Sequence, residues 1–150
     1  MLIVLEGADG VGKTTLAQLL AHTMDAEIIH STRETPNDWE FFSSIMDEAK
    51  TRNIIADRFF WGQFVYQTKA ERHLTDAQLT SLEKRLADEG GKLIYVYAPE
   101  QVIKDRLQAR SEIPSLPVEI LLNRFERMCI FAQCPTIKYD TYKGKVDLLK

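Results

Sequence analysis

The sequence predicts an α/β protein, a P-loop three-layer α/β/α sandwich built on a five-stranded parallel sheet. A glycine-rich loop at residues 7–14 follows a short apolar run and precedes a helical pattern, which is the setting of a phosphate-binding P-loop. Short apolar runs then alternate with helical patterns along the rest of the chain. Because these runs lack polar alternation, we expect the strands to be covered by helices on both faces of the sheet.

The first half of the chain is predicted to form three strands and three helices. Residues 2–5 read Leu-Ile-Val-Leu, a buried strand, and the helix predicted at 13–24 has Leu16, Leu19 and Leu20 at helical spacing. The pattern then predicts strands at 26–30 and 53–56 and helices at about 38–50 and at 58–71.

The second half contains clearer helix-start signals. Thr75 and Gln78 have the spacing of a capping box, and Pro99 and Pro117 stand where helices are expected to begin. The predicted elements are helices at 75–89, 99–110 and 117–133 and strands at 92–97 and 136–139.

Length and composition predict a single domain over residues 1–150. Hydrophobic residues make up 45% of the chain and charged residues 27%, which is typical of a globular protein. The net charge of −3 argues against an extended nucleic-acid-binding surface. No apolar run approaches the roughly 20 residues of a membrane span, and no signal-peptide pattern precedes the first strand, so we expect a cytoplasmic protein with no membrane partner. Cys129 and Cys134 are predicted to be free thiols.

The glycine-rich loop has the residues that phosphate binding requires. Glycines let successive backbone N–H groups converge on phosphate oxygens, and the following helix adds its positive end. Lys13 is placed to contact the terminal phosphates of ATP, and Thr14 to offer its hydroxyl to Mg²⁺. A turn that merely joins a strand to a helix would not need Lys-Thr. The predicted nucleotide-binding residues are Gly7, Ala8, Asp9, Gly10, Val11, Gly12, Lys13, Thr14 and Thr15.

Two further polar loops follow strands, at the edge where ligands of parallel sheets bind. The loop at 31–36 contains Arg33, and the third strand leads into Asp57-Arg58. An acid at position 57 suits a Mg²⁺ ligand, and an arginine at position 58 suits a phosphate contact. The alternative for this pair is a helix N-cap followed by a surface arginine.

Together these stretches resemble the thymidylate kinase family of P-loop nucleoside monophosphate kinases. The resemblance rests on four segments of the chain, which are Leu5 to Thr15, Thr32-Arg33-Glu34, Asp57-Arg58-Phe59 running to Tyr66-Gln67, and Arg106/Arg110 leading into Asn123-Arg124. It implies transfer of the γ-phosphoryl group of ATP to a deoxynucleoside monophosphate, dTMP or a related dNMP, with Mg²⁺ as cofactor.

The resemblance also implies roles for individual acceptor-side residues. By family position, Asp9 would lie near the acceptor's sugar and the metal, and Arg33 and Arg58 would hold the acceptor phosphate. Gln63 would approach the base, and Tyr66 would pack against the sugar and disfavour a 2′-hydroxyl.

Arg106 and Arg110 lie one helical turn apart, just before the irregular stretch at 111–117. From the residues alone, they could be a solvated helix face aided by the C-terminal dipole. The resemblance instead places them on a short lid, around 106–117, that closes over the ATP phosphates. The catalytic residues that we expect are Asp9, Lys13, Arg58, Arg106 and Arg110.

The chain departs from the family pattern in two places. Only about 20 residues separate Pro36 from Asp57, where the family has a longer segment whose Phe and Arg read the base. Trp39 and Phe42 could stack on a base instead, although aromatic residues at helical spacing more often belong to the core. The chain also stops soon after residues 141–143, which leaves adenine packing open.

Two other function classes remain open from the sequence. One is a kinase that acts on a deoxynucleoside or on a modified base in DNA. The other is a non-catalytic module that binds nucleotide and signals its presence to a partner. The arginines beyond the P-loop favour an enzyme, because a nucleotide sensor would not need them. We expect small nucleotide substrates as partners, and the sequence leaves open whether the protein forms a homodimer.

Overall fold

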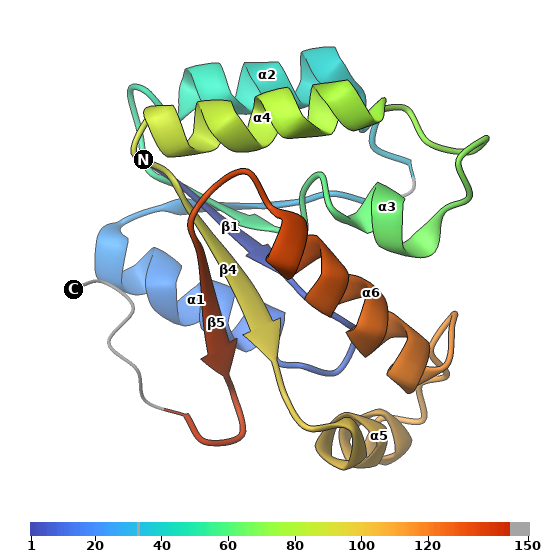
Figure 1. The fold of residues 1–150 in the computed structure, drawn as a ribbon. Helices are drawn as coiled ribbons and strands as arrows, with labels where there is room; N and C mark the ends of the chain where they lie inside the picture. The colour runs from blue at the N-terminus through green and yellow to red at the C-terminus, as the bar shows by residue number, and fades with distance from the viewer. Residues whose placement is uncertain (33, 145–150) are drawn as a thin grey trace.

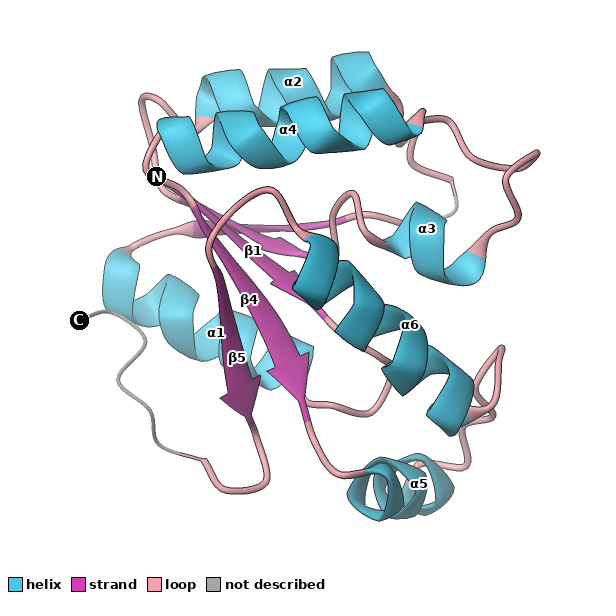
Figure 2. Cartoon of the chain, viewed as in Figure 1, coloured by secondary structure: helices cyan, strands magenta, loops and turns pink. Residues whose placement is uncertain are grey.

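The computed structural model of the protein describes residues 1–32 and 34–144. At its centre, these residues form a five-stranded sheet in the spatial order β2-β3-β1-β4-β5, and every neighbouring pair is parallel (Figure 2). The strands are β1 (Leu2–Glu6), β2 (Glu27–His30), β3 (Ile54–Asp57), β4 (Lys92–Tyr97) and β5 (Thr136–Asp140). The predicted five-stranded parallel sheet is confirmed.

Helices cover both faces of this sheet. They are α1 (Lys13–Met24), α2 (Trp39–Glu48), α3 (Gly62–Tyr66), α4 (Asp76–Asp88), α5 (Glu100–Ala109) and α6 (Val118–Phe131). In Figure 1, α1 lies on one side of the sheet, while α2, α4 and α6 lie on the other. This is the predicted three-layer arrangement. Within the described part of the chain, no helix has both the length and the apolar composition needed to cross a bilayer.

The central strands are buried throughout, which explains their unbroken apolar sequences. Every residue of β1 and of β3 is buried. In α1, Leu16 and Leu20 pack into the core, whereas Leu19 is 61% exposed. The two cysteines are free thiols, as predicted.

The strand order places the P-loop at the centre of the sheet. After β1 the chain moves outward to β2 and returns through β3, and β4 pairs on the opposite side of β1. In the register of the sheet, Asp57 lies beside Leu5 of β1 and beside His30 of β2. The carboxyl ends of β1, β2 and β3 therefore meet at the point where the winding direction reverses, and parallel sheets bind ligands there.

Two helix starts follow local side-chain chemistry. The predicted capping box at α4 is confirmed, since the amide of Gln78 donates to the Thr75 hydroxyl (3.1 Å) and the amide of Thr75 donates to the Gln78 side chain (2.9 Å). Asp38 caps α2 by accepting a hydrogen bond from the amide of Phe41 (2.9 Å).

The helix predicted at 58–71 is much shorter in the structure, where α3 covers only Gly62–Tyr66. Arg58 adopts a left-handed conformation (φ 71°) that a helix cannot continue through. Trp61 is fully buried, and its indole N–H donates to Glu83 of α4 (2.9 Å), which fixes the turn before α3. Gln67 is extended and ends the helix. Tertiary contacts therefore override a helical pattern here.

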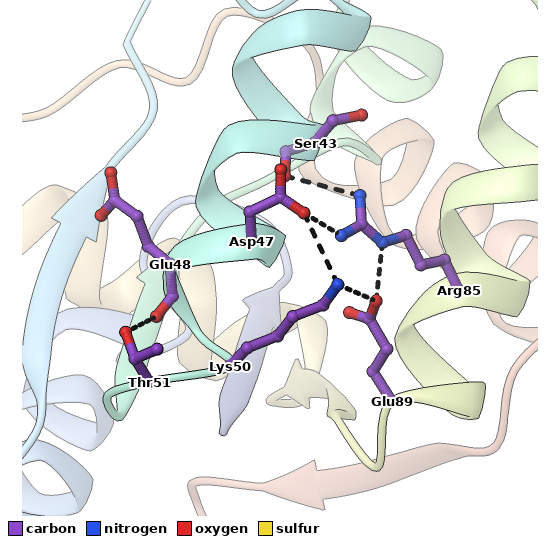
Figure 3. A network of polar contacts seen from close by, with 7 residues as sticks. All are labelled: Ser43, Asp47, Glu48, Lys50, Thr51, Arg85 and Glu89. Atoms are coloured by element: carbon purple, nitrogen blue, oxygen red, sulfur yellow. Dashed lines mark hydrogen bonds and ion pairs between the residues drawn. The ribbon is translucent and has the colours of Figure 1, made fainter.

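A polar network joins α2 to α4 on the surface (Figure 3). Arg85 of α4 contacts Asp47 of α2, and its Nε donates to Glu89 (2.9 Å). Lys50 bridges the same two carboxylates, at 3.8 Å from Asp47 and 3.7 Å from Glu89. The Glu89 contact raises the pKa of Arg85, and the Arg85 contact lowers the pKa of Asp47. The network holds the two helices together away from the carboxyl ends of the strands.

Candidate active site

The P-loop connects the end of β1 to the start of α1 and passes very close to β4. A Cβ atom at Gly7 would lie 2.3 Å from the carbonyl oxygen of Val96, so only glycine fits. Gly10 has a φ of 84° and packs against Leu107 of α5. Both glycines serve a loop whose backbone must curl tightly.

Lys13 is folded back onto this loop. Its ammonium group donates to the carbonyl oxygens of Gly7 (2.7 Å) and Ala8 (2.8 Å), and the residue is buried. Burial, together with the positive charge of Arg58, lowers the pKa of Lys13 to about 8. An anion bound in the loop would favour the charged form, so the site suits a phosphate group.

Two side-chain oxygen groups lie side by side where α1 begins and β3 ends. The hydroxyl of Thr14 donates to Oδ2 of Asp57 (2.9 Å), and Asp57 is buried at the end of β3. His30 Nδ1 lies 3.3 Å from the same carboxylate oxygen. A carboxylate and a hydroxyl next to a phosphate site are a donor set that fits Mg²⁺, which otherwise keeps waters and phosphate oxygens as ligands.

Two cavities open at the carboxyl ends of the strands, each with a volume of about 500 Å³. We call the first the P-loop cavity, because its lining includes Gly10, Gly12, Lys13, Thr14, Thr15, His30, Asp57, Arg110 and Glu112. We call the second the Tyr66 cavity, and its lining includes Glu6, Gly7, Asn37, Phe59, Gln63, Tyr66, Gln67, Ile113, Ser115 and Phe125. Both cavities are also lined by Asp9, Ser31, Thr32 and Arg58. The two cavities therefore adjoin.

An ion pair stands at the junction of the cavities. A guanidinium nitrogen of Arg58 contacts Oδ1 of Asp9. The backbone of Arg58 is left-handed, and its amide donates to the carbonyl of Leu5 (3.0 Å). A non-glycine residue held in this region costs on the order of 1–2 kcal/mol, and such strain clusters at functional sites. The strained turn directs the Arg58 side chain to the boundary between the two cavities.

Residues 3–121 match a protein-family model described as an AAA domain. The chain belongs to this family. Over 96 residues it is 32% identical to a probable thymidylate kinase from Methanocaldococcus jannaschii, an alignment that covers 47% of this chain and 51% of that protein. The chain thus spans about half the length of this curated relative, and the resemblance to thymidylate kinases is confirmed as a similarity.

This AAA domain is also similar to solved structures over nearly its whole length. The crystal structure of the YorR protein from Bacillus subtilis, in complex with phosphorylated GDP, has a TM-score of 0.82 and 28% identity, covering 97% of this chain and 88% of that one. A deoxyadenosine kinase from M. mycoides with bound dATP has a TM-score of 0.62 and 16% identity, covering 99% and 93% of the two chains. At that identity, the second comparison shows a shared fold alone.

Arg106 and Arg110, which the sequence predicts to act together, make different contacts in this AAA domain. Arg110 lines the P-loop cavity, where its Nε lies 3.6 Å from Glu112. Arg106 is instead bound to the P-loop backbone. Its Nη1 donates to the carbonyl oxygens of Gly10 (3.3 Å) and Val11 (3.2 Å) and to the hydroxyl of Thr141 (3.0 Å). In this conformation, Arg106 braces the loop from outside and Arg110 faces the space above it.

Tyr66 and Gln63 both line the Tyr66 cavity, but their side chains are held by different contacts. Tyr66 packs edge-on against Phe125, with 6.0 Å between ring centroids. The Gln63 amide is held by the backbone, since its Nε2 donates to the carbonyl of Asn37 and its Oε1 accepts from the amides of His73 (2.9 Å) and Leu74 (3.2 Å). Its amide is thus occupied by structural bonds rather than left open for a base.

The aromatic residues that were expected to stack on a base lie away from the cavities. The prediction that Phe42 stacks on a base is wrong. Its ring is fully buried and packs edge-on against Phe59 (4.7 Å between centroids), so no face is left for a base. Trp39 is half-buried against the core and is not among the residues that line either cavity. Arg33 lies outside the described residues.

Sequence reasoning missed Glu6, which precedes the P-loop and lines the Tyr66 cavity. Its Oε1 accepts a hydrogen bond from the amide of Phe59. Burial raises the pKa of Glu6 to about 7, more than the Phe59 amide and the charges of Lys13 and Arg58 lower it. The signal in the sequence was a single acid at the end of an otherwise apolar strand.

Glu6 should make the stability of the protein depend on pH. The pKa is higher in the folded chain than in the unfolded chain, so between about pH 4.5 and pH 7 only the folded state keeps this proton. The free energy of unfolding should therefore fall as the pH rises through this window, by at most about 3 kcal/mol from this group. Urea unfolding at pH 5 and pH 8 should show a smaller pH difference in Glu6→Gln than in the wild type. Equal differences in both proteins would contradict the assignment.

Proposed function

We propose that this protein is a Mg²⁺- and ATP-dependent phosphotransferase whose acceptor is a deoxynucleoside monophosphate, with dTMP or a related dNMP as the acceptor that the thymidylate kinase resemblance implies. One observation carries the proposal. A cavity with the residues of a P-loop adjoins a second cavity of equal size, and Asp9 and Arg58 stand at their junction. Phosphoryl transfer needs this arrangement of a donor site and an acceptor site that meet end to end.

The residues divide the work between the two sites. Backbone N–H groups of the P-loop and the Lys13 ammonium bind the donor phosphates and stabilise charge on the transferring group. Thr14 and Asp57 would hold a Mg²⁺ ion, which would supply positive charge to the phosphate oxygens. Arg58 leaves Asp9 to hold the acceptor phosphate, and Tyr66 packs against the sugar. Arg110 approaches the transferring group from the P-loop cavity.

The relatives support this proposal. The curated relative is named a probable thymidylate kinase, and YorR was solved with a phosphorylated guanine nucleotide. ADP release should be measured with ATP and Mg²⁺ over a panel of dNMPs, deoxynucleosides and single-stranded DNA. The proposal expects turnover with at least one dNMP. If none of the acceptors in the panel supports ADP release, the proposal is overturned in favour of a nucleotide-binding module.

A second candidate function is phosphorylation of a hydroxyl group, as in a deoxynucleoside acceptor. Glu6 is the observation that favours it. A hydroxyl must lose its proton during transfer, and a carboxylate with a pKa of about 7 inside the acceptor cavity is suited to act as general base. A phosphate acceptor is already ionised at neutral pH and needs no base.

Glu6→Gln separates the two functions. Glutamine can still accept the Phe59 amide hydrogen bond, but it cannot take a proton. If the acceptor is a dNMP, kcat should change by less than about tenfold. If the acceptor is a hydroxyl, kcat should fall by roughly 10²- to 10⁴-fold, which is the usual size of general-base catalysis. Glu40→Gln, on the exposed side of α2, makes the same chemical change outside both cavities and serves as the control.

A further inference from the structure

We infer that the Tyr66 cavity selects a base that donates hydrogen bonds from an amino group, as adenine, cytosine and guanine do, over the carbonyl-rich thymine or uracil. The inference rests on the proposed function, because it assumes that the cavity holds the acceptor nucleotide, and within that function it favours a related dNMP over dTMP. It assigns the selection to the side-chain oxygens of Asn37 and Gln67.

The first observation is a set of unpaired oxygen atoms. Within residues 1–32 and 34–144, five side chains that line this cavity each have an oxygen that is buried and has no hydrogen-bond partner, namely Glu6 Oε2, Ser31 Oγ, Asn37 Oδ1, Tyr66 Oη and Gln67 Oε1. The hydroxyls of Ser31 and Tyr66 can donate as well as accept, whereas the amide oxygens of Asn37 and Gln67 can only accept. A buried polar atom without a partner is costly, and native proteins rarely keep one without a reason. Several in the lining of one cavity indicate that a polar ligand completes the site.

The Asn37 oxygen is fixed as an acceptor. The Nδ2 of the same amide donates to the carbonyl of Thr32 (2.7 Å), and a flipped amide would set oxygen against oxygen there. The backbone of Asn37 is left-handed (φ 45°), and its carbonyl accepts the Gln63 side chain. Because Gln63 is itself held by the amides of His73 and Leu74, the position of Asn37 is set before any ligand binds.

Gln67 is also bound to Gln63. The backbone N–H of Gln67 donates to the backbone carbonyl of Gln63 (3.2 Å) at the end of α3. Gln63 therefore contacts both residues that carry an unpaired amide oxygen, through its side chain to Asn37 and through its backbone to Gln67, and both residues line the cavity. Gln63 is therefore a positioning residue, and Asn37 and Gln67 contact the base.

The charged side chains of the cavity agree with this selection. Glu6, Asp9 and Glu71 supply carboxylates, while Arg58 is the one cation among the described lining residues and is paired with Asp9 at the phosphate end. An exocyclic amino group can donate to the two amide oxygens. The carbonyl of thymine or uracil at the same place would face them with another acceptor. Leaving such groups unpaired should lower kcat/KM by about 10- to 100-fold.

Matched acceptors test the inference directly. The bases of dCMP and dUMP differ in an amino group against a carbonyl on the ring, and dGMP and dIMP differ in the presence of an amino group. With saturating ATP and Mg²⁺, kcat/KM should be at least about tenfold higher for the amino member in the pair that fits the cavity, and dTMP should fall below it. An equal or better rate for the other member in both pairs would overturn the inference and leave the proposed function standing.

A variant series assigns the selection to residues. Gln67→Leu should lower kcat/KM for the amino acceptor by about tenfold and leave dTMP nearly unchanged, whereas Gln67→Glu keeps an acceptor oxygen and should keep the preference. Gln101→Leu, on the exposed face of α5, is the matched control. An unchanged preference in Gln67→Leu together with Asn37→Ala would overturn the assignment.

Binding provides a readout that does not depend on catalysis. Calorimetric titration of the same monophosphates, without ATP, should give the same order of affinity. If no dNMP is turned over but the amino members bind more tightly, the proposed function fails and the base selection stands. If the affinities show no preference for the amino members, or no dNMP binds, the inference fails.

Discussion

Replacing Lys13 by alanine is expected to abolish phosphoryl transfer and leave the fold intact. Loss of one preorganised charge stabiliser costs on the order of 10²-fold or more in rate. Lys13 is buried against the P-loop carbonyls of Gly7 and Ala8, and burial together with the charge of Arg58 lowers its pKa, so the fold itself disfavours the charged form. The folded protein without ligand should therefore not need this ammonium group for its stability.

ADP release and thermal unfolding, each measured with and without ATP, give the two parts of this result. Lys13→Ala should unfold near the wild-type temperature without ATP and should lose most of the stabilisation that ATP gives the wild type. Lys84→Ala, at an exposed position of α4, is the control for removal of a lysine. Near-normal turnover in a folded Lys13→Ala protein would contradict the proposal that Lys13 stabilises the charge on the transferring phosphoryl group.

Replacing Arg110 by alanine should give the second largest loss, roughly 10²-fold in kcat with little change in the KM of the acceptor. The P-loop has Val11 where a cation could stand, so another cation must stabilise the transferring charge. Arg110 lines the P-loop cavity, and its ion pair with Glu112 is long (3.6 Å) and half-exposed, so little holds the side chain back.

Arg106→Ala should produce a different defect. Arg106 donates to two P-loop carbonyls and to Thr141, so its loss should loosen the loop and raise the KM of ATP along with lowering kcat. Arg127→Ala, on the exposed side of α6, controls for loss of an arginine. Full steady-state kinetics in both substrates distinguish the two patterns. If Arg110→Ala turns over normally, the cation must be sought elsewhere.

The sheet and the P-loop could be predicted because their signals are local. An apolar run such as Leu-Ile-Val-Leu requires burial on both faces, and a Gly-Lys-Thr turn after it has few other uses. The capping box of α4 was likewise readable, because Thr75 and Gln78 satisfy each other's amides within one turn.

The acceptor side was harder to predict, because long-range contacts decide it. The helix predicted at 58–71 ends early since Arg58 turns left-handed against β1 and Trp61 is tied to Glu83. Gln63 was predicted to approach the base, but its amide spans to Asn37 and to residues 73–74, which sequence spacing cannot reveal. The sequence predicts no role for Glu6, because its raised pKa exists only once the cavity forms around it.

The Asp9–Arg58 pair has a consequence for the order in which substrates bind. Both residues line both cavities, so a ligand that draws Arg58 away from Asp9 in one cavity changes the charge that the other cavity presents. The ion pair needs to be opened only once. The substrate that arrives first bears that cost, and the second then meets a site already prepared for it. By thermodynamic linkage, the factor by which one substrate changes the affinity of the other is the same in both directions, so under the proposed function we expect the two substrates to bind cooperatively within one small domain.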